Sequence, residues 1–448
     1  MMTMNSLISK PVDTLSGTSL MPGDKSISHR AVLFSALAAG KSEIYGLLEG
    51  DDVKRTASAI RDLGCHVEPR GAGRWIIAGC GIGGLSPANK VLDMGNSGTA
   101  ARLLLGVLAG YNFTTFLTGD KSLCKRPMDR VTVPLSNMGA TFTTSEGRLP
   151  IAIVGAERLL PLEYHLPMAS AQVKSAILLA GLNAPGETTV IEPEPTRDHT
   201  ERMLRHFGGT VDVKPHKDGG NSITIKGQPE LVPTKISIPR DFSSAAFPIV
   251  GALILPGSKV ELPGVGVNQG RIGLLTTLNE MGARIDSSNT HENGSEPIAD
   301  LTIRHSELHG VEVPAERVPS MIDEFPILAI AAACAKGPTT MHGLKELRVK
   351  ESDRLTAIIN GLVASGIRAT STKDTLTIHG ASGRPQGGNR NIIKTHFDHR
   401  IAMSFLILGM CSQKPIVIDD GRSINTSFPN FVELINQIGG NISDMENQ

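Results

Sequence analysis

Lysine, serine and arginine stand close together directly after a Pro-Gly turn signal near the start of the chain, as Lys25, Ser26 and Arg30. Apolar residues follow at helical spacing until Gly40, which predicts a helix capped by Ser26. Free backbone N–H groups and the helix dipole favour an anion at such a helix start. The segment therefore predicts either an anion-binding site or a capped surface helix with solvated charges.

Two further segments of the first half combine a helix start with polar or cationic residues. Gly95–Arg102 reads Gly-Asn-Ser-Gly-Thr-Ala-Ala-Arg, which predicts either an anion-binding nest or a plain capped turn. Ser170–Lys174 opens another helix, and Thr196–His199 follows it. Basic residues also lie close together in the loop that follows Gly95–Arg102, at Lys121, Lys125, Arg126 and Arg130.

The second half opens its helices with acids, namely Asp241, Asp323 with Glu324, and Asp398. Acids there complement the helix dipole, which is a purely structural explanation. However, Leu347–Arg354 has five charged residues among eight, and helical spacing would place Lys350 and Arg354 on one face. This segment predicts a solvated face or, together with the basic helix start at Asp398-His399-Arg400, a second anion site.

An internal repeat organises the whole chain. An apolar residue, a glycine, two variable residues and another apolar residue recur, with Ser in place of the first apolar residue in one copy. The glycines are 69 to 84 residues apart, at positions 64, 139, 208, 282, 366 and 439. Each copy predicts a helix end, a glycine C-cap and a strand. Upstream of each copy a second helix is expected, with starts near Ser26, Ser97, Ser170, Ser243, Asp323 and Asp398. The repeated unit is thus helix, strand, helix, strands, used six times.

Length and composition restrict the class of protein. A chain of 448 residues exceeds one ordinary core, so two domains of three repeats are expected, with a turn-rich boundary in 228–243. A net charge of zero and few aromatic residues disfavour nucleic acid as a partner. Five scattered cysteines favour a reducing compartment, and neither a signal peptide nor a membrane-spanning run is apparent. The sequence predicts a cytoplasmic protein, and a monomer is expected.

Three partial motifs carry no function. Gly79–Gly84 matches a dinucleotide fingerprint, but Leu-Ser-Pro follows it and no helix is expected to open there. The two Gly-Asp-Lys-Ser segments lack the spacing of a nucleotide P-loop. His396 and His399 have no further set of metal ligands near them in sequence. None of these motifs is therefore expected to bind a nucleotide or a metal.

Taken together, the helix starts resemble those of the 5-enolpyruvylshikimate-3-phosphate synthase family over essentially the whole chain. The matching stretches are Pro22–Arg30, Gly95–Arg102, Lys125–Met128, Met168–Lys174, Thr196–Thr200, Met321–Pro326, Leu347–Leu355 and Asp398–Met403. The resemblance implies an α/β (α+β) fold of two domains, each of three βαβαββ units about a pseudo-threefold axis, with the active site in the interdomain cleft. The expected domains are 22–241, and 1–21 plus 242–448.

The resemblance also implies a reaction. The family transfers the enolpyruvyl group of phosphoenolpyruvate to the 5-hydroxyl of shikimate 3-phosphate, releases phosphate and needs no cofactor; it belongs to the shikimate pathway of aromatic amino acid biosynthesis. Both substrates carry several negative charges, which arginine forks and helix starts suit. The rival is the related transferase acting on UDP-N-acetylglucosamine. That family uses a Cys five residues before an Arg, whereas here Cys124 is two before Arg126. A repeat scaffold that binds anions without catalysis is disfavoured by Asp323 and Glu351, because carboxylates oppose anion binding unless they handle protons.

The resemblance assigns roles to individual positions. The residues implied for shikimate 3-phosphate are Lys25, Ser26, Arg30, Ser170, Ala171 through its backbone, Gln172, Arg197, Asp323 and Lys350. Those implied for phosphoenolpyruvate are Lys25, Gly98, Arg126, Gln172, Arg354 and Arg400. Asp323 would accept the 5-hydroxyl proton, and Glu351 and Lys25 are the candidates for moving the proton on the vinyl carbon. One position departs from the pattern: many relatives have Lys where this chain has Thr426, so no role is transferred there.

Overall fold

The protein was analysed as a computed structural model that describes residues 6–388 and 392–445. Its internal contacts divide the chain into two compact units. Unit 1 comprises Met1–Pro22, Pro239–His291 and Pro297–Gln448, and unit 2 comprises Gly23–Ile238 and Glu292–Glu296. These units differ from the expected domains at Pro22, at 239–241 and at the short segment 292–296, which lies at the tip of a hairpin that begins in unit 1.

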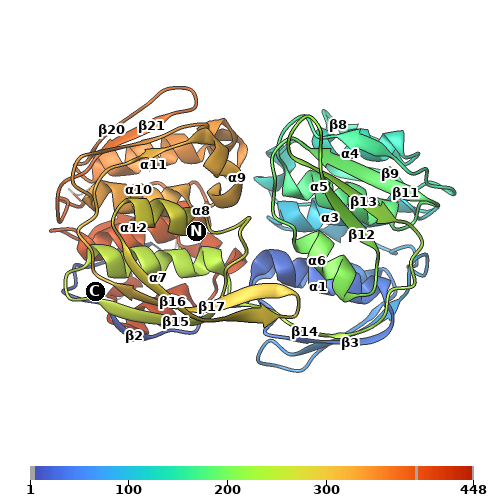
Figure 1. The fold of residues 1–448 in the computed structure, drawn as a ribbon, viewed down its shortest axis with the longest axis horizontal. Helices are drawn as coiled ribbons and strands as arrows, with labels where there is room; N and C mark the ends of the chain where they lie inside the picture. The colour runs from blue at the N-terminus through green and yellow to red at the C-terminus, as the bar shows by residue number, and fades with distance from the viewer. Residues whose placement is uncertain (1–5, 389–391, 446–448) are drawn as a thin grey trace. The chain divides into compact units, whose positions relative to one another are not determined.

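The helices alternate in two sets along the chain (Figure 1). The first helix of each repeat is α1 (Lys25–Leu37), α3 (Gly98–Leu108), α5 (Ala171–Gly181), α7 (Phe242–Ile254), α10 (Phe325–Cys334) or α12 (His399–Cys411). The second helix is α2 (Asp51–Asp62), α4 (Asp129–Asn137), α6 (His199–His206), α8 (Gly273–Glu280), α11 (Arg354–Ala364) or α13 (Phe431–Gln437). Short helical turns are η1 (Leu123–Lys125), η2 (Ala315–Arg317), α9 (Val318–Met321), η3 (Leu344–Val349) and η4 (Arg422–Thr426).

Unit 2 contains three four-stranded sheets, one for each of its repeats. Their strand orders are β14 (Lys235–Ser237), β3 (Ala39–Tyr45), β5 (Trp75–Cys80), β4 (His66–Pro69); then β6 (Leu92–Asp93), β7 (Thr114–Thr118), β9 (Arg148–Val154), β8 (Thr141–Ser145); then β10 (Glu163–His165), β11 (Glu187–Glu192), β13 (Asn221–Lys226), β12 (Val211–Pro215). In each sheet the first pair of strands is parallel and the others are antiparallel. Parallel neighbours require a crossover, which the first helix of each repeat provides in the second and third sheets.

Unit 1 follows the same plan, with strands drawn from both ends of the chain. Its sheets are β16 (Arg284–Asn293), β17 (Glu296–Arg304), β15 (Lys259–Gly266), β2 (Ser16–Thr18); then β18 (Glu312–Val313), β19 (Pro338–Met341), β21 (Leu376–His379), β20 (Arg368–Ser371); then β22 (Ile416–Ile418), β1 (Leu7–Ser9), β23 (Ile442–Asp444). Strand β1 lies between β22 and β23 and pairs antiparallel with both. The βαβαββ architecture expected from the resemblance is therefore confirmed.

The six repeat glycines all adopt positive φ angles, as a helix C-cap requires. The values are 101° at Gly64, 110° at Gly139, 85° at Gly208, 92° at Gly282, 78° at Gly366 and 105° at Gly439. A side chain with a Cβ is strained in this left-handed region, whereas glycine adopts it readily. Each glycine follows the second helix of its repeat and precedes a strand, as the sequence pattern predicts.

Two local predictions were wrong. Ser26 does not cap α1: the cap is Asp24, whose Oδ1 accepts a hydrogen bond from the backbone N–H of Ile27 at 2.8 Å. Lys350 and Arg354 do not share a helical face, because α11 begins only at Arg354 and Lys350 is the C-cap of the separate turn η3. In both cases a preceding aspartate, Asp24 or Asp353, caps the helix and so fixes where it begins.

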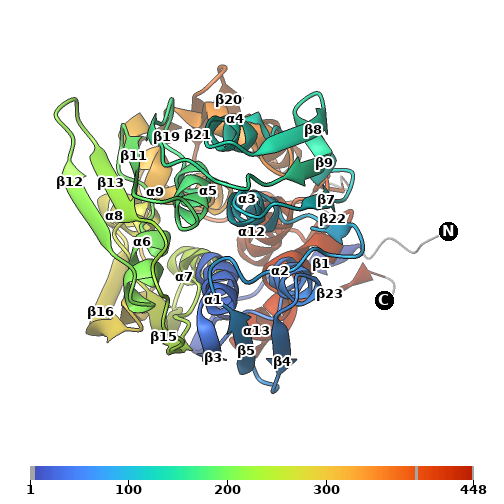
Figure 2. The same cartoon turned by 90° about the vertical axis from the view of Figure 1, so that its right-hand side faces the viewer.

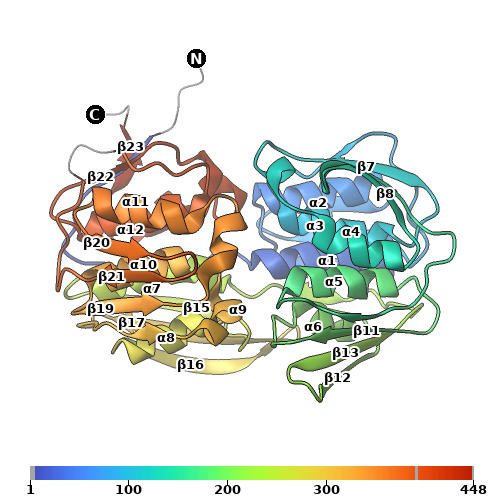
Figure 3. The same cartoon turned by 90° about the horizontal axis from the view of Figure 1, so that it is seen from above.

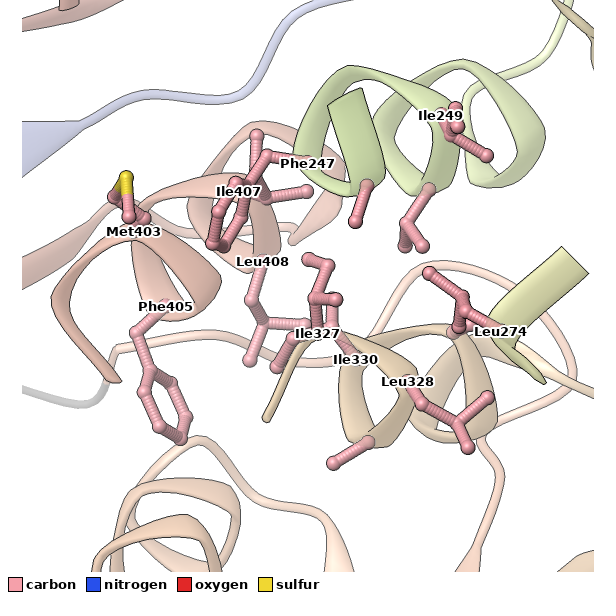
Figure 4. Packing of buried hydrophobic residues seen from close by; sticks show 14 of the residues in the cluster. Phe247, Ile249, Leu274, Ile327, Leu328, Ile330, Met403, Phe405, Ile407 and Leu408 are labelled. Carbon is pink, nitrogen blue, oxygen red and sulfur yellow. The ribbon is translucent and has the colours of Figure 1, made fainter. Parts of the chain in front are cut away.

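The first helices of the repeats form the core of each unit. In unit 1, α7, α10 and α12 run side by side (Figures 1 and 3), and apolar side chains such as Phe247, Ile327 and Leu408 fill the space between them (Figure 4). In unit 2, α1, α3 and α5 lie inside the surrounding sheets (Figure 2). Helix α10 is apolar on every side and buried throughout, as expected of a helix enclosed by others. No helix in the described part of the chain has the length and apolar character needed to span a membrane.

Candidate active site

The N-terminal turns of the three core helices of unit 2 lie together. Gln172 at the start of α5 donates from Nε2 to Oγ1 of Thr99 at the start of α3 at 2.9 Å, and it accepts a hydrogen bond from Arg102. Arg30 of α1 donates to Oγ of Ser175 on α5 at 2.7 Å. We call these joined helix starts the unit 2 cluster. Three helix dipoles thus place their positive ends close together, which favours an anion.

Cationic side chains of the unit 2 cluster are held by neighbouring polar groups. Nζ of Lys25 lies 3.1 Å from Oδ2 of Asp52 on α2. Arg126 is buried and donates to Oδ1 of Asn96 at 2.8 Å. Arg30 is buried as well: its Nε donates to Oγ1 of Thr200 at 2.7 Å. Burial lowers the pKa of Arg30 to about 10, and the guanidinium stays charged at neutral pH.

His29 of α1 is a neutral neighbour of these cations. Its Nδ1 lies 2.7 Å from Oγ1 of Thr56 on α2, and the ring is buried. Burial, followed by the charges of Lys25 and Arg30, lowers the pKa of His29 well below its usual value. The cluster therefore carries its positive charge on lysine and arginine alone at neutral pH, and the imidazole serves to fasten α1 to α2.

Unit 1 has a corresponding cluster, built at the starts of α7, α10, α11 and α12, which we call the unit 1 cluster. Its centre is Arg354, whose side chain is 1 % exposed. Arg354 donates from Nε to Oδ2 of Asp398 at 2.8 Å, from Nη2 to Oε2 of Glu351 at 2.5 Å and from Nη1 to Oδ1 of Asp323 at 3.3 Å. Burial opposes its charge, but these three carboxylates raise the pKa of Arg354 above its usual value.

Asp323 lies between two guanidinium groups. Its Oδ1 contacts Arg354, and its Oδ2 lies 3.8 Å from Nη1 of Arg271. Arg400 donates from Nη1 to the backbone oxygen of Asp323 at 3.0 Å. The Asp323 side chain is 19 % exposed, so it is half-buried and still accessible to a ligand. A carboxylate that is fixed in place and accessible has the geometry that a general base needs.

The predicted residues are divided between the two units. Those in unit 2 are Lys25, Ser26, Arg30, Gly98, Arg126, Ser170, Ala171, Gln172 and Arg197. Those in unit 1 are Asp323, Lys350, Glu351, Arg354 and Arg400. In the described residues, 6–388 and 392–445, no group of three or more His, Cys, Asp or Glu side chains is placed to hold a metal ion.

Sequence reasoning missed several residues that hold the predicted ones. Arg102 donates to Gln172 and lies at the end of the predicted segment Gly95–Arg102. Asp52 at the start of α2 accepts from Lys25 and lies outside every predicted segment. Arg271 contacts Asp323 but lies in a loop before α8, away from every repeat pattern. Glu324, which caps α10, is 0 % exposed and accepts a hydrogen bond from Ser243. The sequence marks Glu324, with Asp323, as an acid at a helix start, but it assigns Glu324 no role in the site.

The fold is one that enolpyruvyl transferases have. The enolpyruvyl transferase NikO from Streptomyces tendae superimposes with a TM-score of 0.77 over 98 % of this chain and 99 % of its own, at 18 % identity. The chain belongs to the EPSP synthase (3-phosphoshikimate 1-carboxyvinyltransferase) family, whose model matches residues 9–435. An EPSP synthase from Acinetobacter baumannii has a TM-score of 0.84 and 46 % identity, covering 98 % of this chain and 100 % of that one.

Curated relatives match over nearly the whole length. The 3-phosphoshikimate 1-carboxyvinyltransferase of Paramagnetospirillum magneticum is 56 % identical over 438 residues, 98 % of each chain. That of Granulibacter bethesdensis is 57 % identical over 425 residues, 94 % of this chain and 93 % of its own. The family expected from the helix-start motifs is therefore confirmed.

Proposed function

We propose that this protein transfers the enolpyruvyl group of phosphoenolpyruvate to the 5-hydroxyl of shikimate 3-phosphate and releases phosphate. The observation that carries the proposal is the composition of the two clusters. The unit 2 cluster joins three helix starts to buried or half-buried cations, which suits a phosphate group. The unit 1 cluster joins arginines to carboxylates, which suits an anion that must also exchange protons.

The proposed roles follow from these contacts. Asp323 would take the proton of the acceptor hydroxyl as it attacks the substituted carbon of phosphoenolpyruvate, while Glu351 or Lys25 gives a proton to the vinyl carbon. Loss of phosphate and of one proton from the resulting methyl group of the tetrahedral adduct restores the double bond. Glu351 and Asp323 both contact Arg354, so one guanidinium fixes both carboxylates.

The competing acceptor is a UDP-amino sugar. The alternative function would rest on Cys124. Its Sγ donates to the backbone oxygen of Gly119 at 3.3 Å, and it lies within η1, two residues before Arg126. A thiol fixed in this way fits a structural role. We further propose that the enzyme acts in the cytoplasm as a monomer, which its five free cysteines support for a reducing compartment.

A phosphate-release assay tests the function directly. Purified protein and phosphoenolpyruvate are incubated with shikimate 3-phosphate or with UDP-N-acetylglucosamine, and inorganic phosphate is measured. Release only with shikimate 3-phosphate is expected. Release with the UDP-sugar instead would support the rival function, and release with neither would refute both.

We expect glyphosate, which resembles phosphoenolpyruvate but occupies slightly more room, to inhibit this enzyme. Replacing Gly98 by alanine should weaken that inhibition more than it weakens the binding of phosphoenolpyruvate. A Cβ at this position would lie 3.1 Å from Nη1 of Arg126 and 3.6 Å from Cδ1 of Leu123. The added methyl group therefore presses on an arginine that Asn96 holds in place. Because glyphosate is longer than phosphoenolpyruvate, it should lose about tenfold or more in affinity, the usual effect of one misplaced methyl group.

The measurement compares the inhibition constant of glyphosate and the KM of phosphoenolpyruvate in both forms. A urea unfolding curve for Gly98→Ala checks that the fold is intact. Equal losses for inhibitor and substrate, or an unaltered enzyme that glyphosate does not inhibit, would contradict the prediction.

A further inference from the structure

A lysine with two carboxylates is buried in unit 2, beside the unit 2 cluster. Lys174 of α5 is 0 % exposed, and its Nζ lies 2.8 Å from Oε1 of Glu201 on α6 and 3.0 Å from Oε2 of Glu192 at the end of β11. Burial works to lower the pKa of Lys174, but Glu201 and Glu192 raise it above its usual value, so the ammonium group is retained. Removing three charges from water costs desolvation free energy, so the presence of this group in the interior needs a physical reason.

The lysine and its partners hold the irregular segment between β11 and α6. The backbone N–H and the hydroxyl of Thr196 both donate to Oε2 of Glu192, at 3.2 Å and 2.7 Å. Nζ of Lys174 also donates to the backbone oxygen of Thr196 at 3.5 Å. A segment outside helix and strand cannot satisfy its backbone groups by itself, and here buried charges do so. The next residue in the chain is Arg197.

Three elements that carry the proposed phosphate-binding residues meet at Lys174. Helix α5 begins with Ala171 and Gln172, and the irregular segment carries Arg197. Helix α6 carries Glu201 and, one residue earlier, Thr200, whose hydroxyl oxygen accepts the hydrogen bond from Arg30. The charge of Arg197 acts on Arg30, since it contributes to lowering the pKa of that guanidinium. The two positive charges therefore repel each other, and the surrounding structure must overcome that repulsion.

We propose that Lys174, with Glu192 and Glu201, is a positioning residue that holds Arg197 and Arg30 in the arrangement that binds the phosphate of shikimate 3-phosphate. The proposal rests on the proposed function. The buried ammonium fixes α5, α6 and the Thr196 segment to one point, so that the two arginines stay close together before the ligand arrives. Positioning of this kind lowers the entropy lost on binding.

The test uses Thr196→Val in the full chain, because removing Lys174 would leave two buried carboxylates unpaired and could prevent folding. Valine keeps the shape of threonine and removes only the hydroxyl that binds Glu192. We expect the KM of shikimate 3-phosphate, and its dissociation constant measured by calorimetry without phosphoenolpyruvate, to rise about tenfold, the effect of losing one hydrogen bond to a charged group. The KM of phosphoenolpyruvate and kcat should stay near their original values.

Two matched variants complete the test. Thr196→Ser retains the hydroxyl and should restore the affinity for shikimate 3-phosphate. Thr224→Val is the control. It removes a hydroxyl from the sheet that contains β11, where Thr224 Oγ1 lies 2.9 Å from Oγ1 of Thr189, and it should leave the affinity for shikimate 3-phosphate unchanged.

Three results would overturn the proposal: unchanged affinity in folded Thr196→Val, equal losses for both substrates, or an equal loss in Thr224→Val. The dissociation constant of shikimate 3-phosphate measured by calorimetry does not depend on turnover. A protein that binds shikimate 3-phosphate but releases no phosphate would refute the proposed function, while its variants would still decide the role of Lys174.

Discussion

Replacing Asp323 by asparagine is expected to lower kcat by roughly 10²–10⁴-fold, the usual contribution of a general base, and to leave the binding of shikimate 3-phosphate nearly unchanged. Asparagine has the size of aspartate but cannot accept the proton of the 5-hydroxyl. The side chain lies between Arg354 and Arg271, and the single amide oxygen of asparagine can keep the hydrogen bond from Arg354, which is the shorter of the two contacts. The loss should therefore be confined to the chemical step.

The measurement is the rate of phosphate release at saturating substrates, together with the dissociation constant of shikimate 3-phosphate. Asp420→Asn is the matched control: Asp420 is also a unit 1 carboxylate paired with an arginine, with Oδ2 2.6 Å from Nη2 of Arg422, but it has no proposed catalytic role. Turnover near normal in Asp323→Asn, or a comparable loss in both variants, would remove Asp323 from the role of base.

Replacing Arg354 by methionine is expected to lower the free energy of unfolding by about 3–5 kcal/mol, the cost of breaking a buried ion pair by removing one partner. Arg354 is 1 % exposed and its guanidinium contacts three carboxylates, of which Asp398 is 0 % exposed. Methionine fills much of the volume but leaves these negative charges without their cation. Their mutual repulsion and the loss of hydration then favour the unfolded chain.

Urea unfolding followed separately for each unit would measure this loss, since a chain with two compact units need not unfold in one step. The control is Arg304→Met, which removes an arginine that pairs with Asp286 at the surface of unit 1, with side chains 45 % and 71 % exposed. An exposed pair contributes at most about 1 kcal/mol. Equal losses of unfolding free energy in both variants would show that the burial of Arg354 does not add to its contribution to stability.

Regularities within the sequence predicted the parts of the fold that depend on local physics. The six glycines marked helix ends because only glycine adopts the required φ freely, and Ser97, Ser170 and Asp398 capped helices as their side chains suggest. The start of α1 was misplaced because Asp24 and Ser26 are both good caps, and the sequence does not decide between neighbours.

Contacts between residues far apart in the chain could not be predicted from the sequence. Nothing in 235–237 indicates that β14 completes the sheet of the first repeat, because pairing depends on the folded chain and not on local preference. Arg271 escaped notice for the same reason, since a single loop arginine carries no pattern until it is placed 3.8 Å from Asp323. The family motifs supplied the roles of the site residues, and these roles stay predictions until the variants are measured.

The position of β1 has a consequence for how the chain folds during its synthesis. Leu7 pairs with Ile418 on one side and with Asp444 on the other, so β1 has no complete set of partners until the last strand is made. At about 5–20 residues per second, the 437 residues from position 8 to Asp444 (444 − 7) take on the order of 20–90 s to translate. Residues 23–238 are continuous in the chain and can form almost all of unit 2 in that interval. The ribosome thus releases a chain whose second unit is nearly folded before its first unit can close its last sheet.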